Sequence, residues 1–307
     1  MICRAIEISG QGKHLRKERG FLVVSEDRVD LAKLPIDDLE VVLLSSDGMT
    51  CTGGVFTTLA QRCIPLVVCD QRFVPCSVLW PVESHHLQSG RIRAQAAMSE
   101  PLRKRLWQQV VRAKILAQAE ALHLCTGTSS PRLDQLVREV LSGDTTNVEG
   151  QAARLYWSLL FGDEFRRGRD LPGRNSLLNY GYTILRSAVA RAVMLAGLHP
   201  AFALHHHNVL DTMPLVDDLI EPFRPVVDAC VFDLTKHRGE ATPLDAAAKQ
   251  RLIAVTAVDL EFDGIASPLT ECLLRMTRSL ADVCAGTRRA LQLPSGLKCG
   301  SSTQDDD

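Results

Sequence analysis

Acidic residues and a run of three histidines are the groups in this sequence best suited to chemistry. His205, His206 and His207 follow an apolar segment, Glu221 lies shortly after them, and Glu149 lies earlier in the chain. Two carboxylates and one imidazole form an oxygen-rich ligand set that suits Mg²⁺ or Mn²⁺ better than zinc. Beside basic surface, such an ion would activate a water or a hydroxyl and stabilise charge on a phosphate under attack.

Each acidic residue also has a structural interpretation. Glu149 lies three residues after Thr146, which is the spacing of a helix capping box, and this reading competes with catalysis. Asp218 and Glu221 are three residues apart and share one face of a helix. Because Glu221 has apolar neighbours, its charge needs a partner, which either Arg224 or a metal ion would supply.

The histidines follow a long segment, residues 175–200, whose apolar side chains cover most of the circumference of a helix. A single histidine after such a helix is usually packed and hydrogen-bonded. Three in succession present different faces, so we expect at least one to point inward while the others are solvated.

Composition places the chain among ordinary globular proteins. Its 307 residues, 46% of them hydrophobic, suffice for a full core and for two domains. The start lacks the apolar centre of a secretory signal, and no apolar run approaches the roughly 20 residues of a membrane helix. We therefore expect a cytoplasmic protein, in which ten cysteines without a C-x-x-C pair are reduced thiols.

The pattern of elements changes once along the chain, and the fold class it predicts is α+β multidomain. Short β-branched runs predict strands near residues 5–9, 21–24, 41–44, 66–69 and 76–80, with one helix at 54–62. Helical spacing begins at about residue 102 and continues to about residue 293. We predict an N-terminal β domain at 1–81, a linker at 82–100, an all-α catalytic domain at 101–294 and a disordered tail at 295–307.

Charge is unevenly distributed, although the net charge is −1. Between residues 83 and 123, seven basic residues face three acidic ones, and between 163 and 191 six arginines face three acidic residues. Two basic zones in a neutral protein suit a localised phosphate-binding face. Solvated helix surface explains each zone equally well.

Three segments in this order and spacing, EGQAARLYW, NSLLNYGYTILRSAVARAVMLAGLHP and DLIEPFRPVVD, resemble the CRISPR-associated adaptation integrase. This family is the larger of the two universal spacer-acquisition proteins. The segments GQGKHLRKERGFLVV and IPLVVCD are also similar to that family, particularly to its members from type II systems. The resemblance covers nearly all of residues 1–295.

The resemblance implies an N-terminal β-sandwich, a C-terminal helical domain and one divalent-metal site. Carried over by position, Glu149 and Glu221 are catalytic residues and metal ligands, with Asp218 as an acidic neighbour. The family's Gly-Phe-Leu-His-like motif aligns with the segment that starts at Ala203 here, which selects His206, fifteen positions before Glu221. His205 and His207 are the alternatives that a one-residue slip would select.

The resemblance also implies partners. Members of the family bind a short DNA duplex across a homodimer that is bridged by the smaller adaptation protein, and the effector nuclease of a type II system is a further candidate partner. The implied phosphate contacts are Arg91, Arg93, Lys104, Arg105 and Arg112, which position DNA without reading its sequence.

The three tyrosines, Tyr156, Tyr180 and Tyr182, flank the candidate site, where packing is the default reading and stacking on a nucleotide the alternative. The sequence therefore predicts an Mg²⁺- or Mn²⁺-dependent DNA endonuclease and integrase that inserts prespacer DNA into the repeat array by 3′-hydroxyl attack. The alternatives are a catalytically silent DNA-binding scaffold and a metallohydrolase of small phosphoesters.

Overall fold

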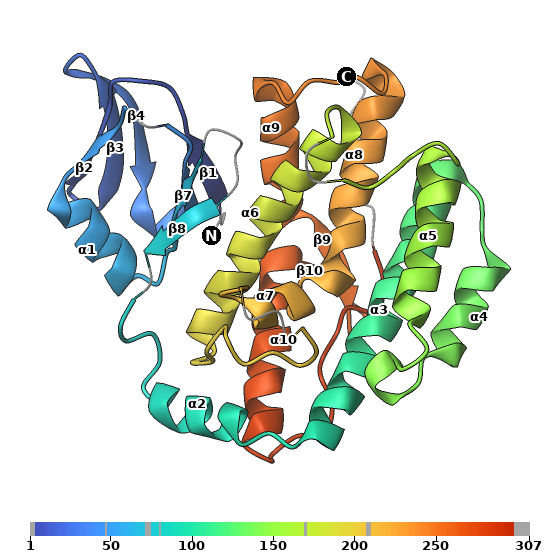
Figure 1. The fold of residues 1–307 in the computed structure, drawn as a ribbon. Helices are drawn as coiled ribbons and strands as arrows, with labels where there is room; N and C mark the ends of the chain where they lie inside the picture. The colour runs from blue at the N-terminus through green and yellow to red at the C-terminus, as the bar shows by residue number, and fades with distance from the viewer. Residues whose placement is uncertain are drawn as a thin grey trace.

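The computed structural model describes residues 4–46, 48–70, 75–79, 81–168, 171–206 and 210–297. Strands fill the first part of the chain and helices dominate the rest (Figure 1). The N-terminal elements are β1 (Arg4–Ile8), β2 (Lys13–Glu18), β3 (Phe21–Glu26), β4 (Val29–Pro35), β5 (Leu39–Leu44), β6 (Thr50–Cys51), α1 (Gly53–Gln61), β7 (Leu66–Cys69) and β8 (Pro75–Leu79), with the short 3₁₀ turn η1 (Ile36–Asp38).

The later elements are α2 (Gln88–Ala96), α3 (Glu100–Thr126), α4 (Pro131–Glu139), α5 (Val148–Phe161), α6 (Arg174–Leu195), α7 (Pro214–Leu219), α8 (Arg224–Arg238), α9 (Ala246–Ile253) and α10 (Leu269–Cys284), with a hairpin of β9 (Asp259–Phe262) and β10 (Ile265–Pro268). Three 3₁₀ turns accompany them: η2 (Ser142–Asp144), η3 (Glu221–Phe223) and η4 (Ala254–Ala257). None of the described helices is long and apolar enough to cross a bilayer.

Two four-stranded sheets make up the N-terminal part. One has the order β1-β5-β7-β8 and the other has the order β4-β3-β2-β6. Strand β5 lies inside the first sheet and is buried along its whole length. Its side chains alternate between two cores, since Val42 and Leu44 pack toward the second sheet and Val41 and Leu43 pack into the helical core. A strand covered on both faces needs the continuous apolar run that the sequence shows.

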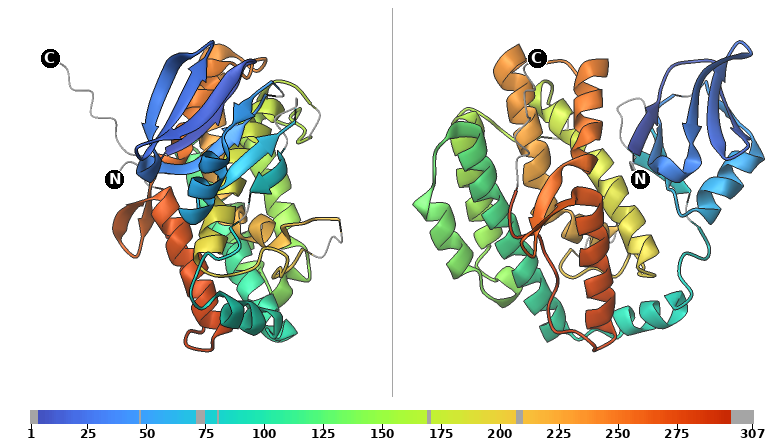
Figure 2. Two further views of the ribbon diagram at one scale, coloured as in Figure 1. Left: turned by 90° about the vertical axis from the view of Figure 1, so that its left-hand side faces the viewer. Right: turned by 180° about the vertical axis from the view of Figure 1, so that it is seen from behind.

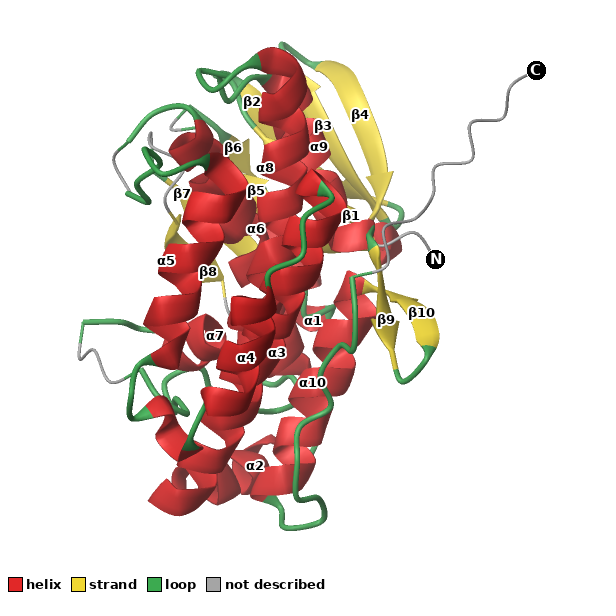
Figure 3. Cartoon of the chain, turned by 90° about the vertical axis from the view of Figure 1, so that its right-hand side faces the viewer, coloured by secondary structure: helices red, strands yellow, loops and turns green. Residues whose placement is uncertain are grey.

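The helical part is built around α6, which is buried on most of its surface. The N-terminal sheets lie against α6 and α9, and α3, α4 and α5 gather on the far side (Figures 1, 2 and 3). The long helix α3 packs against α5, η3 and α8. It therefore touches the elements that carry Glu149 and Glu221, and its Trp107 contacts the histidine loop.

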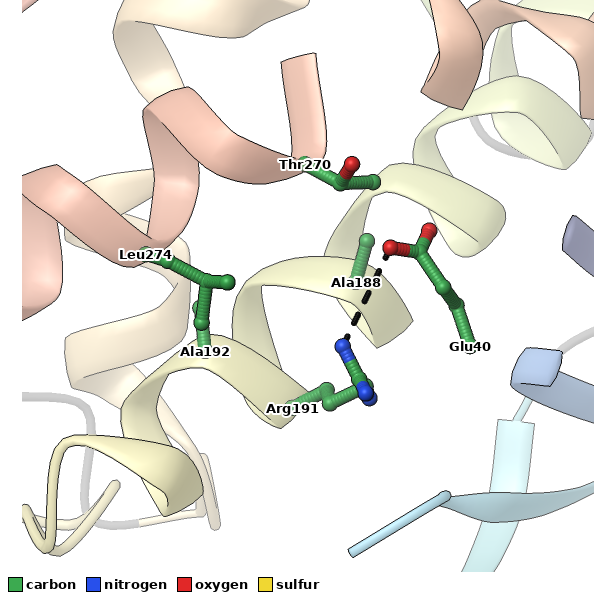
Figure 4. Close-up of a pocket in the computed structure, with 6 residues that line it drawn as sticks. All are labelled: Glu40, Ala188, Arg191, Ala192, Thr270 and Leu274. Carbon is green, nitrogen blue, oxygen red and sulfur yellow. Dashed lines mark ion pairs between the residues drawn. The ribbon is translucent and has the colours of Figure 1, made fainter. Parts of the chain in front are cut away.

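A polar cluster joins the two parts of the chain. Glu7 of β1 accepts a hydrogen bond from the hydroxyl of Tyr180 on α6, at 2.7 Å, and pairs with the ammonium of Lys249 on α9, at 2.8 Å. Farther along α6, the guanidinium of Arg191 lies 3.8 Å from the carboxylate of Glu40, beside a cavity of about 10 Å³ (Figure 4). A cavity of that size holds no more than a water molecule, so these contacts fix the two parts against each other and bind no substrate.

The mixed α+β class predicted from the sequence is confirmed, and the strands predicted near residues 5, 21, 41, 66 and 76 are present as β1, β3, β5, β7 and β8. Strands β2, β4 and β6 were missed, and the β9–β10 hairpin shows that the region predicted to be all-α contains a small sheet. The expected linker contains α2. Ser295 and Gly296 pair with Glu261 of β9, so regular contacts continue into the predicted tail. Residues 298–307 of that tail lie outside the described residues.

Candidate functional site

Glu149 is the second residue of α5, and its side chain does not cap that helix. The cap is Asn147, whose side-chain oxygen accepts from the Gly150 amide at 3.1 Å. Asp144 accepts from the amides of Val148 and Glu149, at 2.9 and 3.0 Å. These two side chains satisfy the first turn, so the capping-box reading is wrong and the Glu149 carboxylate extends away from the helix start.

Glu221 opens the 3₁₀ turn η3, directly before a proline, and its side chain is only 7% exposed. The guanidinium Nε of Arg224 lies 2.8 Å from Oε1 of Glu221. The predicted ion pair between these residues is therefore confirmed. Burial alone would raise the pKa of Glu221, but the charges of Arg224 and then Lys114 outweigh it and lower the pKa below its ordinary value.

Asp218 is fully buried and holds the histidine loop. Its carboxylate accepts hydrogen bonds from the backbone amides of Leu204, His205 and His206, at 2.6, 2.9 and 3.2 Å. It also lies 2.6 Å from Nδ1 of His206. Four contacts to one carboxylate fix both the backbone and the ring orientation of His206.

The two described histidines of the run face different ways. His205 stacks on Trp107 of α3, with ring centroids 4.5 Å apart and an interplanar angle of 1°. His206 meets the same indole edge-on and turns Nδ1 to Asp218. His207 lies outside the described residues.

Lys114 of α3 lies between the two glutamates. Its ammonium Nζ is 2.5 Å from Oε1 of Glu149 and 2.5 Å from Oε2 of Glu221. Burial works against the charged form, but Glu221 and Glu149 outweigh burial and raise the pKa of Lys114. Sequence reasoning counted this lysine in a basic zone. The available signal was its position four residues after Val110 and next to Ile115, on the buried stripe of the helix.

His206 belongs to the same electrostatic neighbourhood. The hydrogen bond to Asp218 is the largest influence and raises the pKa of His206, burial opposes that rise, and the charges of Glu221 and Glu149 add to it. Glu149, His206 and Glu221 come from three segments that are distant in the sequence, and they lie near enough for the two glutamates to influence the charge of His206.

The residues present fit a hard divalent cation in their chemistry. Two carboxylates already converge on one cation, the Lys114 ammonium, and Oε2 of Glu221 is buried without an aligned hydrogen-bond donor. Oxygen ligands with one imidazole suit Mg²⁺ or Mn²⁺. Within the described ranges, however, no three His, Cys, Asp or Glu side chains stand as a ready-made ligand group. Between the two carboxylates, the position of a cation is taken by the Lys114 ammonium.

The five candidate DNA contacts divide into two groups. Arg91 donates to the carbonyl of Ala196 at 2.7 Å, and Arg112 donates to the carbonyl of Val140 at 3.0 Å, so both stabilise the helical part itself. The other three face solvent, on α2 and at the start of α3: Arg93, Lys104 and Arg105. These three can meet a phosphate without breaking a contact to the backbone.

The three tyrosines are packed. Tyr156 and Tyr182 both donate a hydroxyl hydrogen bond to the buried carboxylate of Asp228 on α8, and Tyr180 donates to Glu7. Their rings are at most 7% exposed. The packing interpretation is confirmed, and a nucleotide has no open ring face on which to stack.

A pocket of about 290 Å³ lies at the opposite end of α5 from Glu149. Phe161, Phe165 and Arg174 are among its lining residues. Acidic Glu164 and Glu240 line it as well as arginines, so it has no clear preference for a phosphate. It is separate from the group formed by Glu149, His206 and Glu221.

Comparison with known sequences gives a consistent result. The model of the family described as CRISPR associated protein Cas1 matches residues 6–251. A CRISPR-associated endonuclease Cas1 from Neisseria meningitidis is 37% identical over 254 residues, covering 82% of this chain and 83% of the relative. A second relative of that description, from Pyrobaculum aerophilum, is 28% identical over 289 residues, covering 90% of this chain and 97% of the relative.

Solved structures share the fold. A casposase bound to its integration product superposes with a TM-score of 0.78 at 17% identity, covering 94% of this chain and 92% of that one. A Cas1 protein from Thermotoga maritima gives a TM-score of 0.76 at 16% identity, covering 92% and 97%. A chain of a Cas6-RT-Cas1–Cas2 complex gives a TM-score of 0.73 at 21% identity, covering 95% of this chain and 36% of that one. The chain belongs to the Cas1 family.

Proposed function

We propose that this chain is a divalent-metal-dependent DNA endonuclease and integrase of CRISPR adaptive immunity. It inserts short prespacer DNA into the repeat array by attack of a 3′-hydroxyl on a phosphodiester. One observation carries the proposal: in a member of the Cas1 family, Glu149 and Glu221 converge on one buried cation with His206 beside them.

Glu149, His206 and Glu221 are the residues that hold Mg²⁺ or Mn²⁺. Because Nδ1 of His206 is bonded to Asp218, its Nε2 is left as the ligand atom, an arrangement typical of metal-binding histidines. When bound, the ion supplies Lewis acidity toward an oxygen nucleophile and toward the phosphate. The chain's own part is to orient the imidazole through Asp218 and to keep Glu221 ionised through Arg224.

The proposed partners are DNA, a second copy of the chain and the smaller adaptation protein. Arg93, Lys104 and Arg105 are the phosphate contacts that remain open to solvent. We take the two N-terminal sheets as the β-sandwich of the family and as the homodimer contact. An effector nuclease of a type II system as a partner and a cytoplasmic location complete the proposal. Among the structural neighbours, the casposase bound to its integration product supports DNA as a partner, and the Cas6-RT-Cas1–Cas2 complex supports the smaller adaptation protein.

The test is strand transfer of a labelled short duplex into a supercoiled plasmid that carries the repeat array, with the smaller adaptation protein present. Transfer should require Mn²⁺ or Mg²⁺ and stop in EDTA. Glu221→Gln and His206→Ala should each abolish it, by at least a hundredfold, while folding is retained. His205→Ala is the matched control and should keep transfer, since that ring stacks on Trp107. If transfer persists in His206→Ala and stops in His205→Ala, the histidine ligand is His205 and not His206.

A catalytically silent DNA-binding scaffold is the second candidate, and Lys114 is the observation that favours it. An ammonium bound to both carboxylates makes a stable site that needs no metal ion. A scaffold binds duplex DNA equally well in EDTA and in Mn²⁺ and transfers no strand. Metal-dependent transfer by the wild-type chain would exclude it.

A further inference from the structure

The environment of Lys114 is unusual for a lysine. It lies in the middle of α3 among residues that are fully buried, with Val110 and Val111 on the preceding turn and Ile115 next to it. Lysine is almost never buried without a charged partner. A structural role for this residue therefore depends on the groups at its ammonium end.

Those groups are the two carboxylates of the candidate metal site. The ammonium has three hydrogens to donate and lies 2.5 Å from one oxygen of Glu149 and 2.5 Å from one oxygen of Glu221. Glu149 begins α5 and Glu221 begins η3, so a side chain of a third element, α3, joins them. Without it, the buried carboxylate of Glu221 and the partly exposed carboxylate of Glu149 would face each other, with Arg224, which is paired to Glu221, as the counter-charge.

We infer that Lys114 is a tethered cation that competes with a divalent metal ion for the carboxylates of Glu149 and Glu221. The ammonium contacts an oxygen of each carboxylate that the proposed metal would use. Two cations within contact distance in a buried site repel each other strongly, because the surroundings screen little. Metal binding therefore requires the ammonium to withdraw.

The competition has two opposite consequences. In the metal-free chain Lys114 stabilises the fold, since it pairs with both carboxylates, and that of Glu221 is almost fully buried. In the presence of metal it lowers affinity, since its contacts must be broken first. If Lys114 acted only through packing, its loss would destabilise the metal-free chain but would not increase the affinity for metal.

The inference rests on the proposed metal-dependent function, but it is tested without DNA and without turnover. Mn²⁺ is titrated into the full chain and free Mn²⁺ is followed by electron paramagnetic resonance. Lys114→Met, which keeps the length of the side chain and removes the charge, should bind Mn²⁺ at least tenfold more tightly than wild type. Its thermal unfolding midpoint in EDTA should fall by several degrees, and Mn²⁺ should restore it.

Two controls accompany this variant. Lys236→Met removes a solvent-exposed lysine of α8 and should leave both the Mn²⁺ affinity and the unfolding midpoint unchanged. Lys114→Arg keeps a positive charge and should keep the weak Mn²⁺ affinity of wild type. If Lys114→Met does not fold, Glu149→Gln is compared with the double variant Lys114→Met/Glu149→Gln, in which loss of the ammonium should again tighten binding.

Equal or weaker Mn²⁺ binding upon loss of Lys114, in either background, would overturn the inference. If wild type still performs metal-dependent strand transfer in that case, the proposed function stands and only the role of Lys114 falls. Absence of both Mn²⁺ binding and strand transfer would overturn the inference together with the proposed function.

Discussion

The carboxyl group of Asp228 on α8 gives a sharp test of how the helices around the site are held. It accepts hydrogen bonds from Tyr156 of α5 and Tyr182 of α6, and it is 1% exposed. Burial is the largest influence on this group and raises its pKa to about 7, while the two hydroxyls and the charge of Arg224 offset burial only in part. The perturbation is Asp228→Asn, which resembles the protonated carboxyl and can still bond both hydroxyls.

Proton linkage gives the direction and the size of the change in the free energy of unfolding with pH. An aspartate in an unfolded chain has a pKa of about 3.9, so between pH 4 and pH 7 the folded state holds a proton that the unfolded state has lost. The stability that this group contributes is fully present at about pH 4 and is lost as the pH rises toward 7. The loss is about 1.4 kcal/mol per pH unit, or at most roughly 4 kcal/mol in total.

The assay is urea unfolding in EDTA at pH 5, 6, 7 and 8, for wild type and Asp228→Asn. The free energy of unfolding of the variant, relative to that of wild type, should be lowest at pH 5 and should increase by roughly 3 kcal/mol between pH 5 and pH 8. Asp233→Asn is the control for removing an aspartate from a solvent-facing position of the same helix, where it pairs with Arg251. The reasoning is refuted if Asp228→Asn is less stable than wild type by the same amount at every pH.

Three further predictions concern packing and charge. Glu7→Gln removes the buried charge that joins β1 to α9 and should lower the free energy of unfolding by about 2 to 3 kcal/mol, measured by urea unfolding. Gly181→Ala should cost about 1 to 3 kcal/mol in the same assay, because the new carbon would lie 2.5 Å from Cγ1 of Val227. Arg93→Ala should weaken duplex binding and should reduce the slope of log affinity against log salt concentration by about one. Arg91→Ala should instead lower the thermal unfolding midpoint, because Arg91 donates to the Ala196 carbonyl. An Arg91→Ala chain with an unchanged thermal midpoint would contradict the assignment of Arg91 to a structural role.

Most of the strands that the sequence revealed carry buried side chains; β8, an edge strand without a buried side chain among its described positions, is the exception. Strand β5 contributes side chains to two cores, and four consecutive apolar residues, Val41 to Leu44, make its run clear. In β2, Leu15 is the one fully buried side chain, and β4 is an edge strand with mostly exposed positions. Such strands carry charges at their solvated positions and are specified by pairing with β3, which a local pattern does not contain.

The sequence indicated which acidic residues belong to the candidate site, but it indicated only part of how they are arranged. Glu221 next to apolar residues indicated a buried charge with a partner, and Arg224 is that partner. Glu149 suggested a cap because its spacing fits one, but Asp144 satisfies the helix start instead. The contact of Lys114 with both glutamates depends on the packing of α3 against α5 and η3, which no local sequence pattern encodes.

The buried carboxylate of Asp218 makes the histidine loop and the turn that carries Glu221 a single mechanical unit. Three amides and one ring of the loop are attached to a residue only three positions before Glu221. A displacement of α7 therefore carries His206 and Glu221 together and preserves their separation. Glu149 stands on a different helix, so its separation from His206 and Glu221 depends on how α5 packs relative to this unit.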